Sequence, residues 1–209
     1  MTDIQFSEFP KIPQLFRDMT ITEKIDGTNA AVGIVQGRTD KGPRRAEVKV
    51  ANEWYTVYAQ SRKRLINPDV DNFGFACWVW TNAAELVKIL GPGLHFGEWW
   101  GQGIQRGYDL DHRRFSLFNT HRWGWLDIPE ARAAHEAPDQ LHVVPVIAKY
   151  AFDTDVIRDS LNVLKDKGSY AAPGFMNPEG VCVYHSAGNH IHKVTFDMDM
   201  HKSELELAA

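Results

Sequence analysis

The stretch TEKIDGTN, residues 22–29, carries the pattern from which the rest of this chain is best understood. It sets an Asp-Gly pair between two apolar, strand-like segments, and this arrangement is the strongest short-range pattern for a β-hairpin. A hairpin explains Asp26 and Gly27. It does not explain why Lys24 stands two residues before the turn, or why Asn29 follows it, so these two side chains require a chemical explanation.

The composition is that of an ordinary globular chain. Its 209 residues are enough to bury one well-filled core, and 44% of them are hydrophobic and 24% charged. The N-terminus is polar and acidic, and no run of about 18 apolar residues follows it, which predicts a soluble, cytoplasmic protein with no membrane contact. Cys77 and Cys182 lie in apolar runs, which predicts two buried, reduced thiols.

Charge excludes one class of nucleic-acid-binding protein. The net charge of −4 argues against a protein that coats nucleic acid without specificity, although it leaves room for a local basic groove. Basic residues gather in three clusters, at 62–64, at 106 with 112–114, and at 121–122. Clusters of this kind usually form a solvated face.

The apolar pattern predicts an α+β fold, with mainly antiparallel sheets flanked by a few helices. Strands are expected at 20–24, 30–35, 46–50, 54–60, 94–99, 115–119, 141–148, 180–185 and 190–196. Helices are expected at 73–90, where Gly91-Pro92 ends the pattern, at 129–135 and at 154–167. A polar loop is expected at 36–45, and a hairpin turn at Asn52-Glu53.

Short motifs follow one another in a characteristic order along nearly the whole chain. They are K-x-D-G-x-N at 24–29, QSR at 60–62, FGEWWG at 96–101, FSLFN at 115–119, PEGVCV at 178–183 and HKV at 192–194. In this order they resemble the motifs of the covalent nucleotidyltransferases, the superfamily of ATP-dependent ligases and mRNA capping enzymes. One short motif is weak evidence, whereas the collinear set is specific.

Asn29 directs the resemblance toward one branch of that superfamily. DNA ligases typically carry arginine at this position of the first motif, and RNA ligases carry asparagine. The paired aromatics Trp99 and Trp100 also resemble the small, nick-sealing type of RNA ligase. The resemblance implies an ATP-grasp-like adenylylation domain over residues 1–209. Many relatives append an OB fold or a helical C-terminal domain, and we expect neither here, because this sequence ends about 16 residues after Lys193.

The resemblance makes Lys24 the nucleophile, which would carry AMP as a lysyl-AMP phosphoramidate. A lysine amine is almost fully protonated at neutral pH, so a nucleophilic lysine needs nearby cations or a metal. The resemblance implies that Lys193 contacts the α-phosphate of ATP and joins Lys24 and Asn29 in the catalytic set. It also implies that Glu179 and Asp26 lie at a site for Mg²⁺ or Mn²⁺. Both acids are otherwise explained as turn residues.

Four further residues are assigned to nucleotide binding by the resemblance. Glu98 would accept a hydrogen bond from a ribose hydroxyl, and Phe118 would stack on adenine. Arg62 would reach the nucleotide or the incoming 5′-phosphate, through the bidentate geometry that arginine offers to phosphate. Glu23 completes this set. An aromatic side chain in FSLFN is equally well explained as part of the core.

The last motif departs from the family pattern. It commonly carries two lysines separated by one residue, whereas Ile191 stands two positions before Lys193. His190 or His192 would supply the missing charge, or the enzyme would be slower. The two histidines would also form half of a metal site, but a third ligand is not evident. HKVT matches one H-x-T tetrad of the two-histidine phosphoesterases, whose second tetrad the sequence lacks. Rossmann and P-loop patterns are missing as well.

The predicted activity is the ATP-dependent sealing of RNA 5′-phosphate and 3′-hydroxyl ends, through lysyl-AMP and an adenylylated 5′ end. Nicked or broken RNA and ATP are the expected partners, with a partner protein where the basic surface of the domain gives too little RNA affinity. A small DNA ligase, a non-catalytic nucleotide- or RNA-binding module and, with less support, a capping enzyme are the alternatives. By analogy, a compact ligase of this kind suits RNA repair in a phage or virus.

Overall fold

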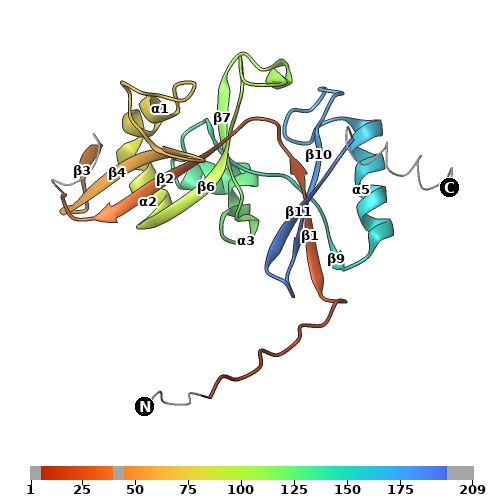
Figure 1. The fold of residues 1–209 in the computed structure, drawn as a ribbon. Helices are drawn as coiled ribbons and strands as arrows, with labels where there is room; N and C mark the ends of the chain where they lie inside the picture. The colour runs from red at the N-terminus through yellow and green to blue at the C-terminus, as the bar shows by residue number, and fades with distance from the viewer. Residues whose placement is uncertain (1–5, 40–44, 197–209) are drawn as a thin grey trace.

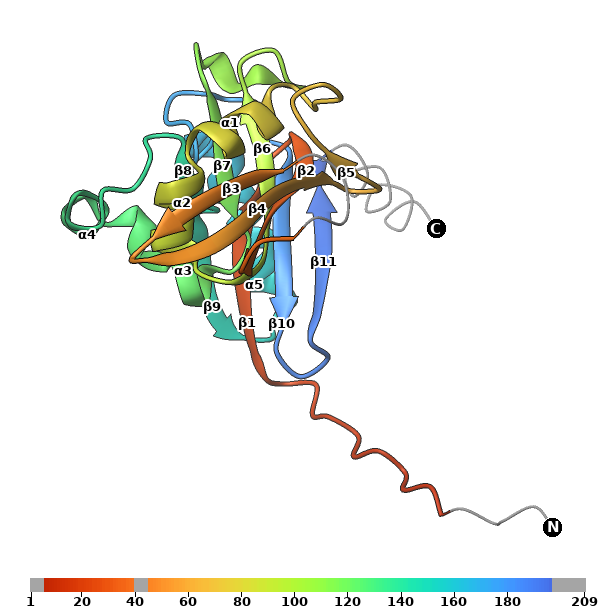
Figure 2. The same ribbon diagram turned by 90° about the vertical axis from the view of Figure 1, so that its left-hand side faces the viewer.

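Two sheets organise the chain in the computed structural model, which describes residues 6–39 and 45–196 (Figures 1 and 2). The four-stranded sheet has the order β11-β10-β1-β9, and all its pairs are antiparallel. Its strands are β1 (Asp18–Lys24), β9 (Val146–Ala151), β10 (Gly180–His185) and β11 (His190–Thr195).

The seven-stranded sheet has the order β3-β4-β2-β6-β7-β8, with β5 paired to β4 outside this path. Its strands are β2 (Thr28–Gln36), β3 (Ala46–Val50), β4 (Glu53–Ser61), β5 (Leu65–Ile66), β6 (Gly93–Gly101), β7 (Arg113–Leu117) and β8 (Leu141–Val143). Only β7 and β8 pair in parallel among the described strands, so the predicted α+β class with mainly antiparallel sheets is confirmed.

Helices cover one face of each sheet. They are α1 (Phe75–Thr81), α2 (Ala83–Leu90), α3 (Thr120–Trp123), α4 (Pro129–Ala134) and α5 (Thr154–Lys167), with 3₁₀ turns at Gly107–Asp109 and Gly124–Asp127. The largest core lies between α1, α2 and the seven-stranded sheet, and a second core lies between α5 and the four-stranded sheet. Each sheet therefore keeps one face that no described helix covers (Figures 1 and 2). None of these helices has the length and apolar character that crossing a bilayer requires.

The hairpin expected at 22–29 is wrong, because its two strands belong to different sheets. β1 pairs with β10 and β9, whereas β2 pairs with β4 and β6. Residues 25–27 thus carry the chain from one sheet to the other. The strand expected at 141–148 is also divided, since β8 and β9 lie in different sheets and Val144 and Pro145 form the return crossing.

The two crossings lie side by side and share a third core. The Glu23 N–H donates to the Pro145 carbonyl at 3.0 Å, which ties the end of β1 to the return crossing. Ile25 from the first crossing and Val144 from the second both pack into the third core. The other buried members of this core are Trp100, Tyr108 and Ala172. We call this region the seam between the sheets.

The expected helix at 73–90 is two helices. Asn82 interrupts it, with φ −103° and ψ 19°, and its side chain donates to the Trp78 carbonyl at 2.8 Å. This bond offers the backbone an alternative to a continuing helix. Gly91 ends α2 with φ 66°, as the Gly-Pro pattern predicts.

The other local predictions hold with small shifts. α5 and the predicted helix coincide, and α4 ends one residue early. β3 and β4 form the expected hairpin, which turns at Ala51-Asn52, where φ is 49° and 69°. The predicted loop at 36–45 lies partly outside the described residues. The prediction of two buried thiols is wrong, because Cys77 is exposed and Cys182 is only partly buried.

Candidate active site

Lys24 is the last residue of β1 and projects from the open face of the four-stranded sheet. Met19, Ile21 and Glu23 alternate with it and are buried on the opposite face or in the seam. The Lys24 Nζ lies 2.6 Å from Oε2 of Glu179, and only 22% and 17% of the two side chains are exposed. Glu179 is placed by Gly180, which starts β10 and pairs with Lys24. Two residues that are far apart in sequence thus form a largely desolvated ion pair.

Glu23 is held in a tight hydrogen-bonded pocket of its own. Its carboxylate accepts from the Ser169 hydroxyl at 2.6 Å and from the backbone N–H groups of Tyr170 and Ala171 at 2.8 and 2.9 Å. Burial raises the pKa of Glu23, and these three donors oppose the rise. The side chain therefore anchors the segment after α5 beneath the Lys24 site. Its assignment to nucleotide binding stays a prediction.

Gly27 is required by the close approach of the first crossing to β6. A Cβ at this position would lie 2.6 Å from the Trp99 carbonyl oxygen, 2.7 Å from the Trp100 Cβ and 2.9 Å from the Glu98 Cγ. Real Cβ atoms do not approach other heavy atoms so closely, so only glycine fits without movement of β6. The Asp-Gly pair, which looks like a hairpin signal, is a close-packed sheet-to-sheet connection.

Glu98 projects from the open face of the seven-stranded sheet toward the same point. It pairs with Asn29 across β2 and β6. Burial raises the pKa of Glu98 to about 7; the Lys24 charge opposes this rise, Glu179 adds to it, and the Gly27 N–H, which donates to the carboxylate, opposes it. The structure therefore brings Lys24, Glu98 and Glu179 together at the seam, as the motifs predict.

Asp26 and Arg106 form a contact that the sequence motifs do not reveal. The Arg106 Nε lies 3.1 Å from the Asp26 Oδ2, and its Nη1 donates to Asn177 at 2.9 Å through the side-chain oxygen. Tyr108 accepts a hydrogen bond from the Asp26 N–H at 2.8 Å. Arg106 thus joins the loop after Lys24 to the segment before Glu179. The sequence places Arg106 in a basic cluster, which predicts a solvated face. Asp26 is 80 residues away, so no sequence motif connects the two residues.

Lys193 lies on the same face of the four-stranded sheet as Lys24. A row here means the residues that pair across neighbouring strands, and the row of Lys193 is the next one on that face after the row of Lys24. It pairs with Cys182 on β10, which pairs with Thr22 on β1. Burial raises the pKa of the Cys182 thiol, and the Lys24 charge is the largest influence that opposes the rise. Ile191 falls one row beyond Lys193, so the lysine that the chain retains is the one nearer to the Lys24 row.

His190 and His192 do not replace the missing lysine. They alternate with Lys193 along β11, and His192 pairs with Val183, whose side chain packs under α5. Their rings therefore project from the opposite face of the sheet. The suggestion that they supply charge to the Lys24 site is wrong. No group of three or more His, Cys, Asp or Glu side chains able to hold a metal ion occurs among the described residues.

Arg62 and Phe118 each follow a strand of the seven-stranded sheet. Arg62 is exposed and comes directly after β4, whose last residue, Ser61, pairs with Ala30. Phe118 follows β7, donates its N–H to the Phe96 carbonyl at 3.0 Å, and is 36% exposed, so it is not a core residue. Both side chains are accessible to a ligand at the seam.

Comparison with known proteins identifies the family. The family model described as RNA ligase matches residues 17–195. This chain belongs to the RNA ligase family. No curated protein sequence matches it.

Solved structures of an RNA ligase from Naegleria gruberi share the fold of this family member. One variant with ATP and Mn gives a TM-score of 0.55 at 15% identity, over 90% of this chain and 52% of that chain. Another variant with ATP and Mn gives 0.55 at 13% identity, over 95% and 58%. The same enzyme with PPi gives 0.53 at 14% identity, over 90% and 52%. The present chain spans about half the length of these ligases, and the likeness shows a shared fold.

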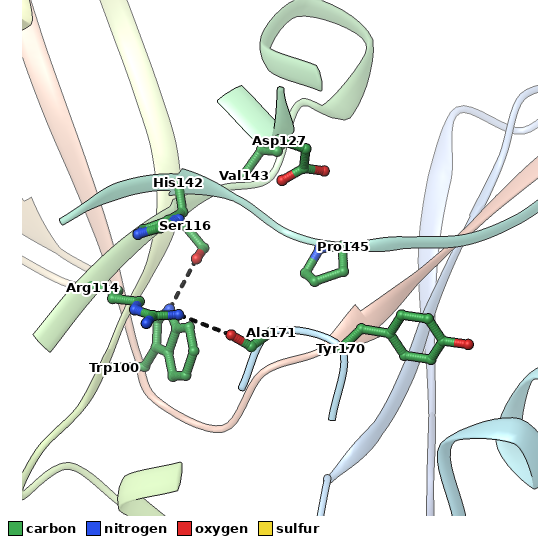
Figure 3. Close-up of a pocket in the computed structure, with 9 residues that line it drawn as sticks. All are labelled: Trp100, Arg114, Ser116, Asp127, His142, Val143, Pro145, Tyr170 and Ala171. Atoms are coloured by element: carbon green, nitrogen blue, oxygen red, sulfur yellow. Dashed lines mark hydrogen bonds between the residues drawn. The ribbon is translucent and has the colours of Figure 1, made fainter. Parts of the chain in front are cut away.

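A small polar pocket of about 100 Å³ lies beside the site of this RNA ligase family member (Figure 3). Arg114 projects into it and donates to the Ala171 carbonyl at 3.0 Å, and Ser116 accepts from the Trp100 indole N–H at 2.9 Å. Burial, and then the charges of Arg132 and Arg114, lower the pKa of His142 to about 4. The pocket thus adjoins the segment that Glu23 anchors, which Arg114 contacts at Ala171.

Proposed function

We propose that this chain is an ATP-dependent RNA ligase that works through a lysyl-AMP intermediate on Lys24. The observation that carries the proposal is the meeting of the Lys24 amine with Glu179 and Glu98 at the seam, where the motifs of the family converge. Membership of the RNA ligase family supports this chemistry. A Lys-Glu pair that served only stability would not need a second, incompletely paired acid beside it.

The proposed reaction has three steps. The Lys24 ammonium first gives up one proton to solvent, and its nitrogen attacks the α-phosphorus of ATP and loses a second proton to solvent. The bond from that phosphorus to the bridging oxygen of the β-phosphate breaks, and pyrophosphate leaves. The 5′-phosphate of RNA then attacks the same phosphorus, so AMP passes to the RNA and the lysine amine is released. The RNA 3′-hydroxyl finally attacks the 5′-phosphate, loses its proton, and expels AMP.

The residues of the chain fit a divalent cation that arrives with the nucleotide. Carboxylate oxygens suit Mg²⁺ and Mn²⁺, and Mg²⁺ is usually bound by one or two carboxylates together with substrate phosphates. Glu179 is the carboxylate in place, and Asp26 is the second candidate. When bound, such an ion would neutralise part of the negative charge of the ATP phosphates.

Each protein side chain then has a definite task. Glu179 holds the Lys24 ammonium in a fixed position at 2.6 Å before the nucleotide binds. Arg106 fixes the Asp26 loop, and Glu98 is set to accept a hydrogen bond from the ribose. Lys193 and Arg62 supply positive charge toward the phosphates, and Phe118 offers an exposed ring to the adenine.

Intact-protein mass spectrometry after incubation with ATP and Mg²⁺ or Mn²⁺ tests the first step. We expect the wild-type chain to gain the mass of one AMP and Lys24→Ala to gain none. Lys149→Ala removes an exposed lysine from β9 of the same sheet and is the matched control, which should gain AMP normally. A folded wild-type chain that is free of AMP at the start and forms no adduct with either metal would overturn the proposal in favour of a non-catalytic binding module.

The acceptor is tested separately. We expect the adenylylated chain to seal a nicked duplex whose 3′ end is RNA, and to seal an all-DNA nick poorly. Equal sealing of both nicks would favour the DNA ligase alternative.

A further inference from the structure

The open face of the seven-stranded sheet displays an unusual set of apolar side chains. Five large ones on this face are between 36% and 49% exposed, namely Val35, Trp54, Leu94, Phe96 and Phe118. α1 and α2 cover the opposite face, and Figure 1 shows them behind the strands. Scattered apolar side chains on a surface are normal, whereas a contiguous patch marks a binding surface. We call these five residues, together with Tyr58, the aromatic face.

Strand register makes the aromatic face continuous. On β2, Ala31 lies opposite Phe96 and Gly33 lies opposite Leu94. On its other side, Gly33 pairs with Tyr58, whose ring fills the space that a Cβ on residue 33 would occupy. Small residues on β2 thus leave room for larger rings from its two neighbours. The result is a broad apolar surface that runs outward along β6 from the seam.

Positive charge borders this surface. The Arg38 guanidinium lies 4.7 Å from the centre of the Trp54 ring, and Lys49 pairs with Trp54 across β3 and β4. Arg62 lies at the other end of β4. Among the described residues, the acids beside them are Glu47, which pairs with Arg38 at 2.7 Å, and Glu53, which precedes Trp54. The border is therefore basic on balance, which complements a polyanion.

The aromatic face also leads directly to the proposed active site. Asn29 and Glu98 form the next row inward from Ala31 and Phe96. Side chains two residues apart on a strand are separated by about 6.6 Å, so a strand of nucleic acid on this face would meet the Lys24 site within a few nucleotides. A protein partner bound here would obstruct that path.

We propose that the aromatic face binds single-stranded RNA next to the end that is to be joined. The rings of Trp54, Tyr58 and Phe96 stack on the bases, Arg38 and Lys49 contact the phosphates, and Phe118 and Arg62 are left to the nucleotide. Sheet-borne aromatic side chains stack on RNA bases in other proteins, and arginine guanidinium planes add to such stacks. This inference rests on the proposed function, since it places the RNA substrate of that same site.

The test uses the full 209-residue chain and a fluorescently labelled, 5′-phosphorylated 12-nucleotide RNA, with binding measured by anisotropy at fixed salt. We expect Trp54→Ala and Phe96→Ala each to weaken binding by about five- to a hundredfold, the range measured for loss of one stacked base. Tyr150→Ala, which removes an exposed aromatic from β9 in the other sheet, should change affinity less than about twofold. Trp54→Phe keeps a ring and should restore most of the binding.

An abasic strand of the same length separates stacking from charge. It keeps the phosphates, so wild type and Trp54→Ala should bind it equally. Wild-type affinity for normal RNA in both alanine variants would overturn the inference, as would an equal loss on the abasic strand. A dimer of the chain that Trp54→Ala dissociates would also overturn it, in favour of contact between two copies.

Lysyl-AMP formation distinguishes this inference from the proposed function. Trp54→Ala should form the AMP adduct as the wild type does, because Trp54 lies at the outer end of the face. Normal adduct formation with unchanged RNA binding would reject the aromatic face alone. A wild-type chain that forms no adduct would reject the proposed function, whatever the RNA binding shows.

Discussion

Glu98→Gln should make the unliganded chain more stable at alkaline pH. Burial raises the pKa of Glu98 from 4.5 to about 7. Below pH 4.5 the carboxyl is protonated in both the folded and the unfolded chain, so it costs the folded state nothing. Between pH 4.5 and 7 it ionises in the unfolded chain but not in the folded one, so stability falls as the pH rises, and the loss is complete above pH 7. The folded state therefore bears a penalty of about 1.4 kcal/mol at pH 5.5 and about 3 kcal/mol at pH 8. Glutamine has no charge to desolvate and can still accept the Gly27 N–H.

Urea denaturation at pH 5.5 and pH 8, without nucleotide or metal, measures this effect. We expect the free energy of unfolding of Glu98→Gln, relative to wild type, to rise by about 2 kcal/mol between the two pH values. Glu53→Gln removes an exposed carboxylate from β4 and should show no such change. A difference between variant and wild type that is the same at both pH values, or smaller at pH 8, would refute the argument that Glu98 is desolvated.

Three further substitutions test other contacts of the site. Gly27→Ala should lower the free energy of unfolding by about 1–3 kcal/mol, because its Cβ would lie 2.6 Å from a backbone oxygen of β6. Gly124→Ala meets nothing within 4 Å and should be neutral in the same urea titration. Arg106→Ala should lower the free energy of unfolding by about 1–3 kcal/mol, because it leaves the largely buried Asp26 carboxylate without its partner, and should slow lysyl-AMP formation as followed by mass spectrometry. An unchanged rate would contradict its positioning role. Ile191→Lys should speed lysyl-AMP formation by adding a cation on the face that bears the Lys24 amine, and an equal gain from Ile191→Gln would count against this explanation.

Local patterns predicted the elements of this fold well, but not how they pair. α5 follows from helical spacing ended by Gly168, and both bounds are confirmed. The Asp-Gly pair failed as a hairpin signal, since a turn pattern specifies a change of direction and not the sheet that the next strand joins. The strand predicted at 141–148 failed in a similar way. Its apolar pattern does not show that the chain changes sheets at Val144 and Pro145. The helix at 73–90 failed because the Asn82 side chain competes for a backbone carbonyl, which apolar periodicity does not register.

The candidate site shows the same division. Lys24, Glu98 and Glu179 were found because they stand in short, ordered motifs, and the fold brings them together. Arg106 was assigned to a solvated cluster because its partner Asp26 is 80 residues away in the sequence. Glu23 entered the predicted set as a nucleotide ligand, yet its carboxylate binds three donors from 169–171. Contacts between residues so far apart in the sequence depend on how the strands are connected and paired. Short sequence motifs carry no information on that pairing.

The seam has a consequence for how the molecule loses activity. Lys24 and Glu98 belong to different sheets, so any partial opening that separates the sheets dismantles the site while each sheet keeps its own core. Such sub-global openings are detected by amide hydrogen exchange. The Asp26 N–H is bonded to the Tyr108 hydroxyl across the seam. Its exchange rate would therefore report how often the unliganded chain leaves its competent form, even when most other amides stay protected.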